Sequence, residues 1–364
     1  MGSEMCIRDR FKVEYTYLPN VKGKNMTAIN DVTKLEVIEN VGVITLNSPP
    51  VNALSANVRE GLDSGMKIAI ENNNIEAIVI ICEGRTFIAG ADISEFGKSF
   101  DGPDLNSALR AIEFSKKPVL AAINGTALGG GLETALVCNY RMGTNKAIVG
   151  LPEVNLGLLP GAGGTQRLPR LVGPSQALKM MLSGTPLSAK KALEQGILDA
   201  ISENSLINDA IAFLQDKIDL SEHPKVRDKN EKLLEARGSE NVLAEAKALA
   251  AKTRRGQFAP GQIIACVEAA INEDDFDVGL KKESDYFLEC LMNPQREAMI
   301  HIFFGERAAS KIADIPKDTP LMPINAAGIV GSGTMGGGIA MNLSLIHISE
   351  PTRLLSSGGC GGGG

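Results

Sequence analysis

Two glutamates occur beside stretches of chain that carry few side chains. Glu133 ends the stretch "NGTALGGGLE", in which Gly129–Gly131 separate an apolar run from the acid. The first turn of a helix has N–H groups without partners, and these groups favour negative charge. The N–H of Gly130 could therefore face an oxygen that becomes anionic during a reaction. The alternative is a flexible loop whose acid complements the helix dipole, and three glycines alone do not decide between the two.

Two further stretches repeat this pattern. "RTFIAGADISEF" places Ala89, Gly90 and Ala91 after an apolar strand and before an acid at a helix start. Two such strand ends could direct two N–H donors at one oxygen, which is how the oxyanion of a thioester would be held. "VGLPEVNLGLLPGAGG" puts Glu153 after another strand, so two carboxyls could enter one apolar site. Their pKa values would be pushed apart, which suits one to act as an acid and the other as a base.

The elements that must position these residues alternate between strands and helices up to about residue 202. Continuous β-branched runs such as "AIVIIC" are typical of strands buried on both faces. Alternating strands and helices predict an α/β fold with right-handed crossovers. We expect strands within 35–47 (two), 77–82, 118–125 and 147–152, and helices at 55–70, 105–116, 132–138, 165–171, 175–182, 188–195, 206–220, 240–251, 260–272 and 278–311.

Composition narrows the class of protein. A formal net charge of −6 argues against nucleic acid or an anionic membrane as the main partner, and no apolar run is as long as a membrane span. The six cysteines show no CxxC spacing, and we expect Cys82 and Cys138 to be buried thiols. None of the three histidines has a second ligand at metal-binding spacing, so we expect no metal site. These features predict a reducing setting, cytoplasmic in a bacterium.

Taken together, the three stretches resemble the crotonase (enoyl-CoA hydratase/isomerase) family. Family-like segments run from "SPPVNALS" to "GILDAI". The helices and the glycine turn beyond them resemble a bifunctional β-oxidation enzyme, in which a hydratase–isomerase module precedes a 3-hydroxyacyl-CoA dehydrogenase. The resemblance implies a crotonase ββα spiral, then a helical segment and a truncated Rossmann βα start. It also implies reversible addition of water to trans-2-enoyl-CoA to give 3-hydroxyacyl-CoA, with 3-enoyl-CoA isomerisation as a second activity.

The resemblance assigns roles to individual residues. Ala91 and Gly130 would donate the two oxyanion-hole N–H groups, Glu133 would activate water, and Glu153 would deliver a proton. Single-function isomerases of the family usually keep only the acid that matches Glu153, so the presence of both acids favours hydration. The residues expected to contact CoA or the acyl group are Ala53, Leu54, Ala89, Gly90, Asp92, Ile93, Gly129 and Pro152.

A glycine motif near the end of the chain suggests a second cofactor. "GIVGSGTMGG" contains Gly331, Gly333 and Gly336 as GxGxxG, a turn that can set a pyrophosphate on a helix N-terminus. The acid expected about 20 residues later falls in a suspect tail, and the dehydrogenase's catalytic histidine region is absent. We therefore expect hydration to need no cofactor, CoA to be part of the substrate, and NAD to serve only the intact parent enzyme.

The two ends of the chain resemble non-native sequence. "SEMCIRDR" and "SLIHISEPTRLLSS" are similar to translated sequencing-adapter read-through, and "GGCGGGG" is low complexity. We expect a non-native leader over 1–25, a hydratase domain over 26–203, a helical segment over 204–316, a linker with the start of an NAD-binding domain over 317–343, and a non-native tail over 344–364.

Other interpretations remain open at this stage. The same fold supports other acyl-CoA chemistry, such as isomerisation, thioester hydrolysis or decarboxylation. The chain could also be a non-functional fragment of a NAD-dependent 3-hydroxyacyl-CoA dehydrogenase. The expected partner is an acyl-CoA thioester. Because the trailing helices would cover a surface used by another subunit, a monomer is favoured over a homotrimer. A peroxisomal location is the alternative if the source is eukaryotic.

Overall fold

The computed structural model describes residues 26–95, 103–309, 315, 319–320, 322–323, 325–331 and 333–346. The expected leader lies outside these residues, as does the expected tail from residue 347 onward. The chain divides into two compact units, Met1–Ala308 and Ala309–Gly364, and the candidate site belongs to the first.

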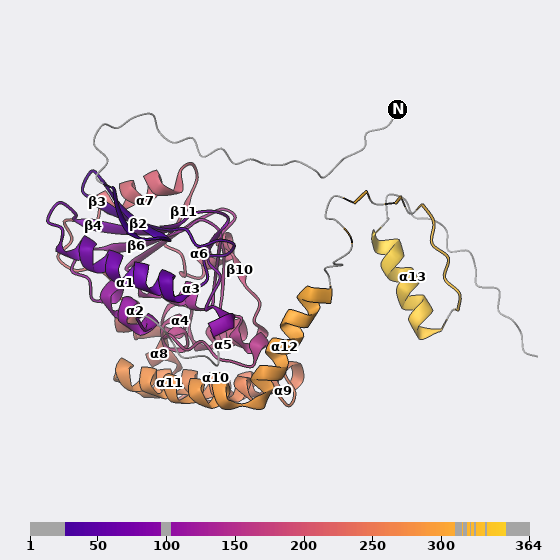
Figure 1. The fold of residues 1–364 in the computed structure, drawn as a ribbon. Coiled ribbons are helices and arrows are strands. Elements are labelled where there is room, and N and C mark those ends of the chain that lie inside the picture. Colours follow the sequence, from indigo (N-terminus) through magenta and orange to yellow (C-terminus); the bar gives the residue numbers. More distant parts are fainter. Residues whose placement is uncertain are drawn as a thin grey trace, which may run out of the picture. The chain divides into compact units, whose positions relative to one another are not determined.

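A seven-stranded sheet forms the frame of the first unit (Figure 1). Its order is β1-β2-β3-β4-β6-β8-β11; the pairs from β1 to β3 are antiparallel and those from β3 to β11 are parallel. The central strands are almost completely buried, which explains their continuous apolar runs. Its strands are β1 (Met26–Asn30), β2 (Thr33–Ile38), β3 (Val41–Leu46), β4 (Ala77–Cys82), β6 (Val119–Ile123), β8 (Tyr140–Thr144) and β11 (Ala200–Ser202).

A smaller sheet of four short strands positions the candidate site. Its order is β10-β9-β7-β5, where β5 is Thr86–Ile88, β7 is Thr126–Leu128, β9 is Ile148–Gly150 and β10 is Leu187–Ser188. Each of β4, β6 and β8 leads into one of these strands and then into a helical turn, which is the expected ββα spiral. Because β5, β7 and β9 run parallel, their carboxyl ends meet at one edge, and the three glycine- and glutamate-bearing stretches follow these ends.

Helices cover both faces of the large sheet. α7 (Leu206–Gln215) packs on one face through Ala210, Ile211 and Leu214, whereas α1 (Ala56–Glu71) belongs to the main core on the other face (Figure 1). The remaining helices of this unit are α2 (Leu105–Glu113), α3 (Gly130–Val137), α4 (Gly164–Val172), α5 (Pro174–Ser183), α6 (Ala189–Glu194), α8 (Glu231–Ala236), α9 (Glu240–Thr253), α10 (Ala259–Asn272), α11 (Phe276–Met292) and α12 (Pro294–Ala309).

The C-terminal helices complete the layer that faces away from α7. α10 and α11 pack together, and both contact α4, which begins in the glycine-rich turn after Glu153. Gly161 lies against Phe287 of α11, and Gly157 lies against Arg296 of α12. The segment expected to trail behind the spiral therefore packs directly on its last turn.

The structure differs from the sequence-based expectations in several elements. The helix expected over 278–311 is two helices, because Pro294 lacks the N–H that a helix interior requires and instead begins α12. β8 was not among the expected strands; it contains Arg141, a buried guanidinium that is paired with Asp199 at 2.9 Å. Cys82 and Cys138 are buried free thiols, as expected.

The described part of the second unit contains one helix, α13 (Thr334–Ile346). The strand expected before the GxGxxG turn is absent, since residues 325–331 form no strand in the part of the unit that the structure describes. A strand needs a neighbour for its backbone N–H and C=O groups, and these described residues pair with none.

Substitution of Gly131 tests how tightly α3 packs on β5. A Cβ at Gly131 would lie 2.0 Å from the carbonyl oxygen of Ile88, a backbone atom that cannot move aside by changing a rotamer. We expect Gly131→Ala to lower the free energy of unfolding by about 1–3 kcal/mol through overpacking, measured by urea unfolding. The matched control is Gly261→Ala in α10, where a Cβ meets nothing within 4 Å. A Gly131→Ala variant as stable as the wild type would contradict the close contact.

Candidate active site

The loops that follow β5 and β7 lie against each other. Leu54 pairs with Ala91 as an isolated parallel bridge, and its N–H donates to Gly90 O at 2.9 Å. Gly129 N–H donates to Gly150 O at 2.9 Å, which ties the end of β7 to the end of β9. Gly129 has φ +55°, a left-handed conformation that favours glycine. The three stretches singled out in the sequence therefore meet at one place.

Two backbone amides at this place have no acceptor among the described residues. Neither Ala91 N–H nor Gly130 N–H donates a hydrogen bond to any of the described residues. The two amides come from separate loops, and a Cβ built on Gly130 would lie 3.8 Å from Ala91 N. The same Cβ would lie 2.7 Å from Leu54 Cδ1, so a side chain would crowd the space beside both amides. Two adjacent unpaired donors are suited to binding one oxygen that becomes anionic.

Glu133 lies in the first turn of α3 and is buried. Its Oε1 accepts hydrogen bonds from Ala162 N and Gly164 N, both at 2.8 Å. Burial raises the pKa of the Glu133 carboxyl, while the two N–H groups and the positive charge of Arg167 oppose the rise. The carboxyl is thus held in place by donors that stabilise its ionised form.

Glu153 begins the turn after β9 and has a different environment. Its Oε2 is buried and accepts no hydrogen bond from the described residues. Its Oε1 lies beside Gly129, where a Cβ would approach to 2.9 Å. Burial raises the pKa of Glu153 well above its ordinary value, and the negative charges of Glu133 and Glu283 add to the rise. Of the two predicted catalytic acids, Glu153 is therefore the one that retains its proton more strongly.

A third carboxyl belongs to this group, and sequence reasoning missed it. Glu283 on α11 is completely buried and accepts hydrogen bonds from Gly163 N at 2.6 Å, Thr165 N at 3.0 Å and Thr165 Oγ1. Burial and the charge of Glu133 raise its pKa to about 8. One signal could have revealed it: Glu283 shares the buried stripe of α11 with Phe276, Gly279 and Cys290. We call Glu133, Glu153 and Glu283 the carboxyl cluster.

The residues expected to contact CoA or the acyl group lie in the joined loops around the two amides. Ala89 N–H donates to Val51 O at 3.2 Å, which fastens the loop after β5 to the loop that contains Ala53 and Leu54. Leu54, Gly90 and Gly129 are buried, and the other residues of the set, Ala53, Ala89, Asp92, Ile93 and Pro152, are half-buried. The structure brings these positions together, and their contacts with a ligand remain predictions.

Asn52 shapes the same loop and was not singled out in the sequence. It has φ +50°, and its side-chain amide donates to Glu83 O at 3.0 Å and to Thr86 O at 2.8 Å. Its Oδ1 accepts from Ser48 N at 2.7 Å. An asparagine that tolerates a left-handed backbone and bonds to neighbouring backbone groups is a typical turn residue. The signal was present in "SPPVNALS", but its partners lie on a distant segment.

Residues 36–254 match the family model described as enoyl-CoA hydratase/isomerase. The chain belongs to this family. It is 37% identical to the peroxisomal bifunctional enzyme of Danio rerio over 336 residues, which cover 88% of this chain and 46% of that protein. It is 38% identical to the peroxisomal bifunctional enzyme of Homo sapiens over 316 residues, which cover 85% of this chain and 43% of that protein. The chain thus spans less than half the length of these curated relatives.

A solved member of the family supports the fold. The structure of carnitinyl-CoA hydratase from Mycobacterium avium superposes with a TM-score of 0.55 at 26% identity, covering 76% of this chain and 97% of that one. The predicted crotonase (enoyl-CoA hydratase/isomerase) family and α/β fold are confirmed. Glu283 lies beyond residue 254, where the match to the family model ends.

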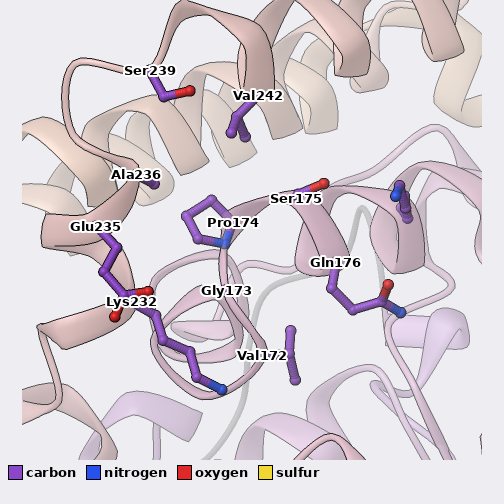
Figure 2. Close-up of a pocket in the computed structure, with 11 residues that line it drawn as sticks. Val172, Gly173, Pro174, Ser175, Gln176, Lys232, Glu235, Ala236, Ser239 and Val242 are labelled. Atoms are coloured by element: carbon purple, nitrogen blue, oxygen red, sulfur yellow. The ribbon is translucent and has the colours of Figure 1, made fainter.

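A pocket of about 410 Å³ lies away from the carboxyl cluster. Figure 2 shows it between the end of α4, the start of α5 and the helices α8 and α9, with Lys232 and Glu235 among its lining residues. Lys232 Nζ donates to the carbonyl oxygen of Leu171, so this cation is engaged within the protein. None of the predicted site residues lines this pocket, and we assign it no role in the family chemistry.

Other kinds of site find less support in the described residues. No three His, Cys, Asp or Glu side chains in this part of the chain are arranged to hold a metal ion. None of the described helices has the length and apolar character needed to cross a membrane. At the GxGxxG turn, Gly331 has φ +103°, and a Cβ at Gly336 would lie 1.9 Å from Gly331 O. This close approach fits a glycine of a dinucleotide-binding motif, but the described residues before Gly331 form no strand, and we derive no NAD chemistry from the motif.

The raised pKa of Glu283 predicts a pH-dependent stability. Its pKa rises from about 4.3 in an unfolded chain to about 8 in the fold. Between these values the folded chain binds a proton that the unfolded chain has released, so stability falls as pH rises. The groups facing Glu283 are the carboxyls of Glu133 and Glu153, the guanidinium of Arg167 and the thiol of Cys266.

The comparison with Glu283→Gln isolates this contribution, because glutamine does not titrate. We expect the difference in free energy of unfolding, wild type minus variant, to decrease from about pH 5 to about pH 8. Urea unfolding at several pH values measures this difference. A difference that stays constant across the range would mean that Glu283 does not retain its proton in the fold.

Proposed function

We propose that this chain is an enoyl-CoA hydratase that adds water reversibly to trans-2-enoyl-CoA to give 3-hydroxyacyl-CoA. One observation carries the proposal. The N–H groups of Ala91 and Gly130, which have no acceptor among the described residues, lie beside two carboxyls with different environments. Membership of the enoyl-CoA hydratase/isomerase family supports the substrate class, a CoA thioester.

The oxyanion donors would act on the thioester carbonyl. When this oxygen accepts from Ala91 N–H and Gly130 N–H, electron density moves toward it and Cβ of the conjugated double bond becomes electrophilic. Because both donors belong to the backbone of loops fixed by hydrogen bonds, they need no reorganisation as the charge develops. The enolate that forms on attack is stabilised at the same position.

The two acids divide the proton transfers. Glu133, whose ionised form is stabilised by two N–H groups, takes a proton from water as the hydroxyl bonds to Cβ. Glu153, whose burial favours the protonated form, delivers its proton to Cα. Proton exchange with solvent then restores both groups, and the reverse reaction uses them in the opposite sense. Hydration on this scheme needs no cofactor, and CoA enters only as part of the substrate.

The wider assignment follows from the relatives. Their names place them in peroxisomes as bifunctional enzymes, and we infer that this chain acts in fatty-acid β-oxidation, in a peroxisome if its source is eukaryotic and in the cytoplasm if it is bacterial. A NAD-dependent dehydrogenase activity would belong to a longer parent enzyme. α10, α11 and α12 cover the last turn of the spiral, which supports a monomer over a homotrimer.

Isomerisation of 3-enoyl-CoA is a second candidate activity. It requires one group that moves a proton between two carbons, and Glu153, with a buried oxygen that accepts no hydrogen bond from the described residues, could serve alone. Incubation with a 3-enoyl-CoA, followed by detection of the 2-enoyl product, tests this activity. Thioester hydrolysis would instead release free CoA, which a thiol reagent detects.

We expect Glu133→Gln and Glu153→Gln each to lower hydratase turnover by at least ~10²-fold, the lower range for positioned acid–base groups. The measurement is the loss of crotonyl-CoA absorbance by the purified variants. Glu194→Gln is the matched control, because this glutamate is exposed on α6 and should leave turnover unchanged. Turnover near that of the wild type in either of the first two variants would refute the assigned roles.

A further inference from the structure

We propose that Glu283 is a positioning residue for Glu133, acting through the turn formed by residues 162–165. The proposal rests on the proposed function insofar as Glu133 is the catalytic base. Glu283 does not need to touch the substrate for this role. It fixes one side of the turn, and the other side of the turn holds the Glu133 carboxyl.

The four N–H groups of the 162–165 turn alternate between two carboxyls. Ala162 N and Gly164 N donate to Glu133 Oε1, both at 2.8 Å. Gly163 N and Thr165 N donate to Glu283 at 2.6 and 3.0 Å. All four donors are buried, so each of them would cost free energy if it lost its acceptor. The position of Glu133 Oε1 is thereby linked to the position of Glu283.

The turn depends on glycine at residue 163. Gly163 has φ +93°, a left-handed conformation that favours glycine, and a Cβ there would lie 1.8 Å from Arg167 Nη1. The turn also forms the N-terminus of α4, whose first N–H groups have no partner within the helix. Two carboxyls supply acceptors that the helix itself lacks.

The helix that carries Glu283 is fixed in the protein interior. Phe276, at its start, stacks beneath the guanidinium groups of Arg167 and Arg170 at 4.9 and 4.8 Å. Gly279 lies against Gln166 Oε1, where a Cβ would approach to 2.3 Å. Phe287, one turn after Glu283, lies against Gly161. These contacts hold α11 against both ends of the turn, so Glu283 is a rigid anchor.

Loss of Glu283 would release one side of the turn. Gly163 N and Thr165 N would then have to find new acceptors, and the turn would shift or admit water to satisfy them. Because Ala162 N and Gly164 N belong to the same turn, the Glu133 carboxyl would lose its fixed position. A misplacement of about 1 Å can cost ~10²-fold in rate. Most of the predicted CoA contacts lie in the loops after β5 and before α1, so substrate binding should change much less.

The test uses the full chain with the variants Glu283→Ala and Glu283→Gln. The control is Glu289→Gln on the same helix, whose exposed carboxylate accepts a hydrogen bond from Gln262 on α10. The first measurement is amide hydrogen exchange, by mass spectrometry, of peptides that include residues 162–165. We expect exchange there to be roughly 10-fold faster or more in Glu283→Ala, because two buried backbone hydrogen bonds are lost. Exchange should be intermediate in Glu283→Gln, which keeps one acceptor oxygen, and unchanged in the control.

The second measurement is crotonyl-CoA hydration by the same proteins. We expect kcat to fall about 10–100-fold in Glu283→Ala while KM stays within about 3-fold, because the lost interaction acts on the chemical step. Exchange at 162–165 as slow as in the wild type, or a rise in KM with unchanged kcat, would overturn the proposal. Glu283→Gln, close in shape to glutamate, keeps the test decisive if the alanine variant does not fold.

The two proposals can fail separately. If the wild-type chain does not hydrate crotonyl-CoA, the proposed function fails, and the exchange data alone decide whether Glu283 holds the turn. If the wild type is active, and the Glu283 variants match the control in both exchange and kcat, the positioning role fails while the hydratase assignment stands.

Discussion

Four consecutive N–H groups, in residues 162–165, are the constraint on which the carboxyl cluster depends. Their acceptors are two buried carboxyls from helices far apart in the sequence, Glu133 on α3 and Glu283 on α11. Burying one carboxyl is costly unless donors compensate it, and a second nearby raises the cost. A single turn supplies donors to both, and Arg167, paired with Glu113, adds a positive charge within reach of each.

The small sheet positions backbone groups, rather than side chains, at the site. Its three parallel strands end at one edge, and the residues beyond those ends are mostly glycine or alanine. The three glycines before Glu133 serve separate purposes: Gly129 takes a left-handed conformation beside Glu153, Gly130 leaves room beside two amides, and Gly131 lets α3 approach β5. A flexible turn does not account for these contacts, whereas close approach of backbone to backbone does.

Much of this arrangement could be predicted from the sequence, and the exceptions have physical causes. Glu133 and Glu153 stand out because each follows an apolar strand and has glycine near it. The strands of the small sheet, two or three residues long, are too short to show a period. Glu283 lies in "KKESDY", which is typical of a solvated helix face, and only its place on a buried stripe distinguishes it. Its partners are 118 and 120 positions away, so no local pattern can reveal them.

The alternating donors of the turn also have an evolutionary consequence. A side chain larger than glycine at residue 163 would meet Arg167, and a change at residue 283 would leave two amides without acceptors. Both positions are therefore constrained by the same turn. A descendant that lacks an equivalent of α11 loses the acceptor of Gly163 N–H and Thr165 N–H, and must satisfy these two buried donors by a different arrangement.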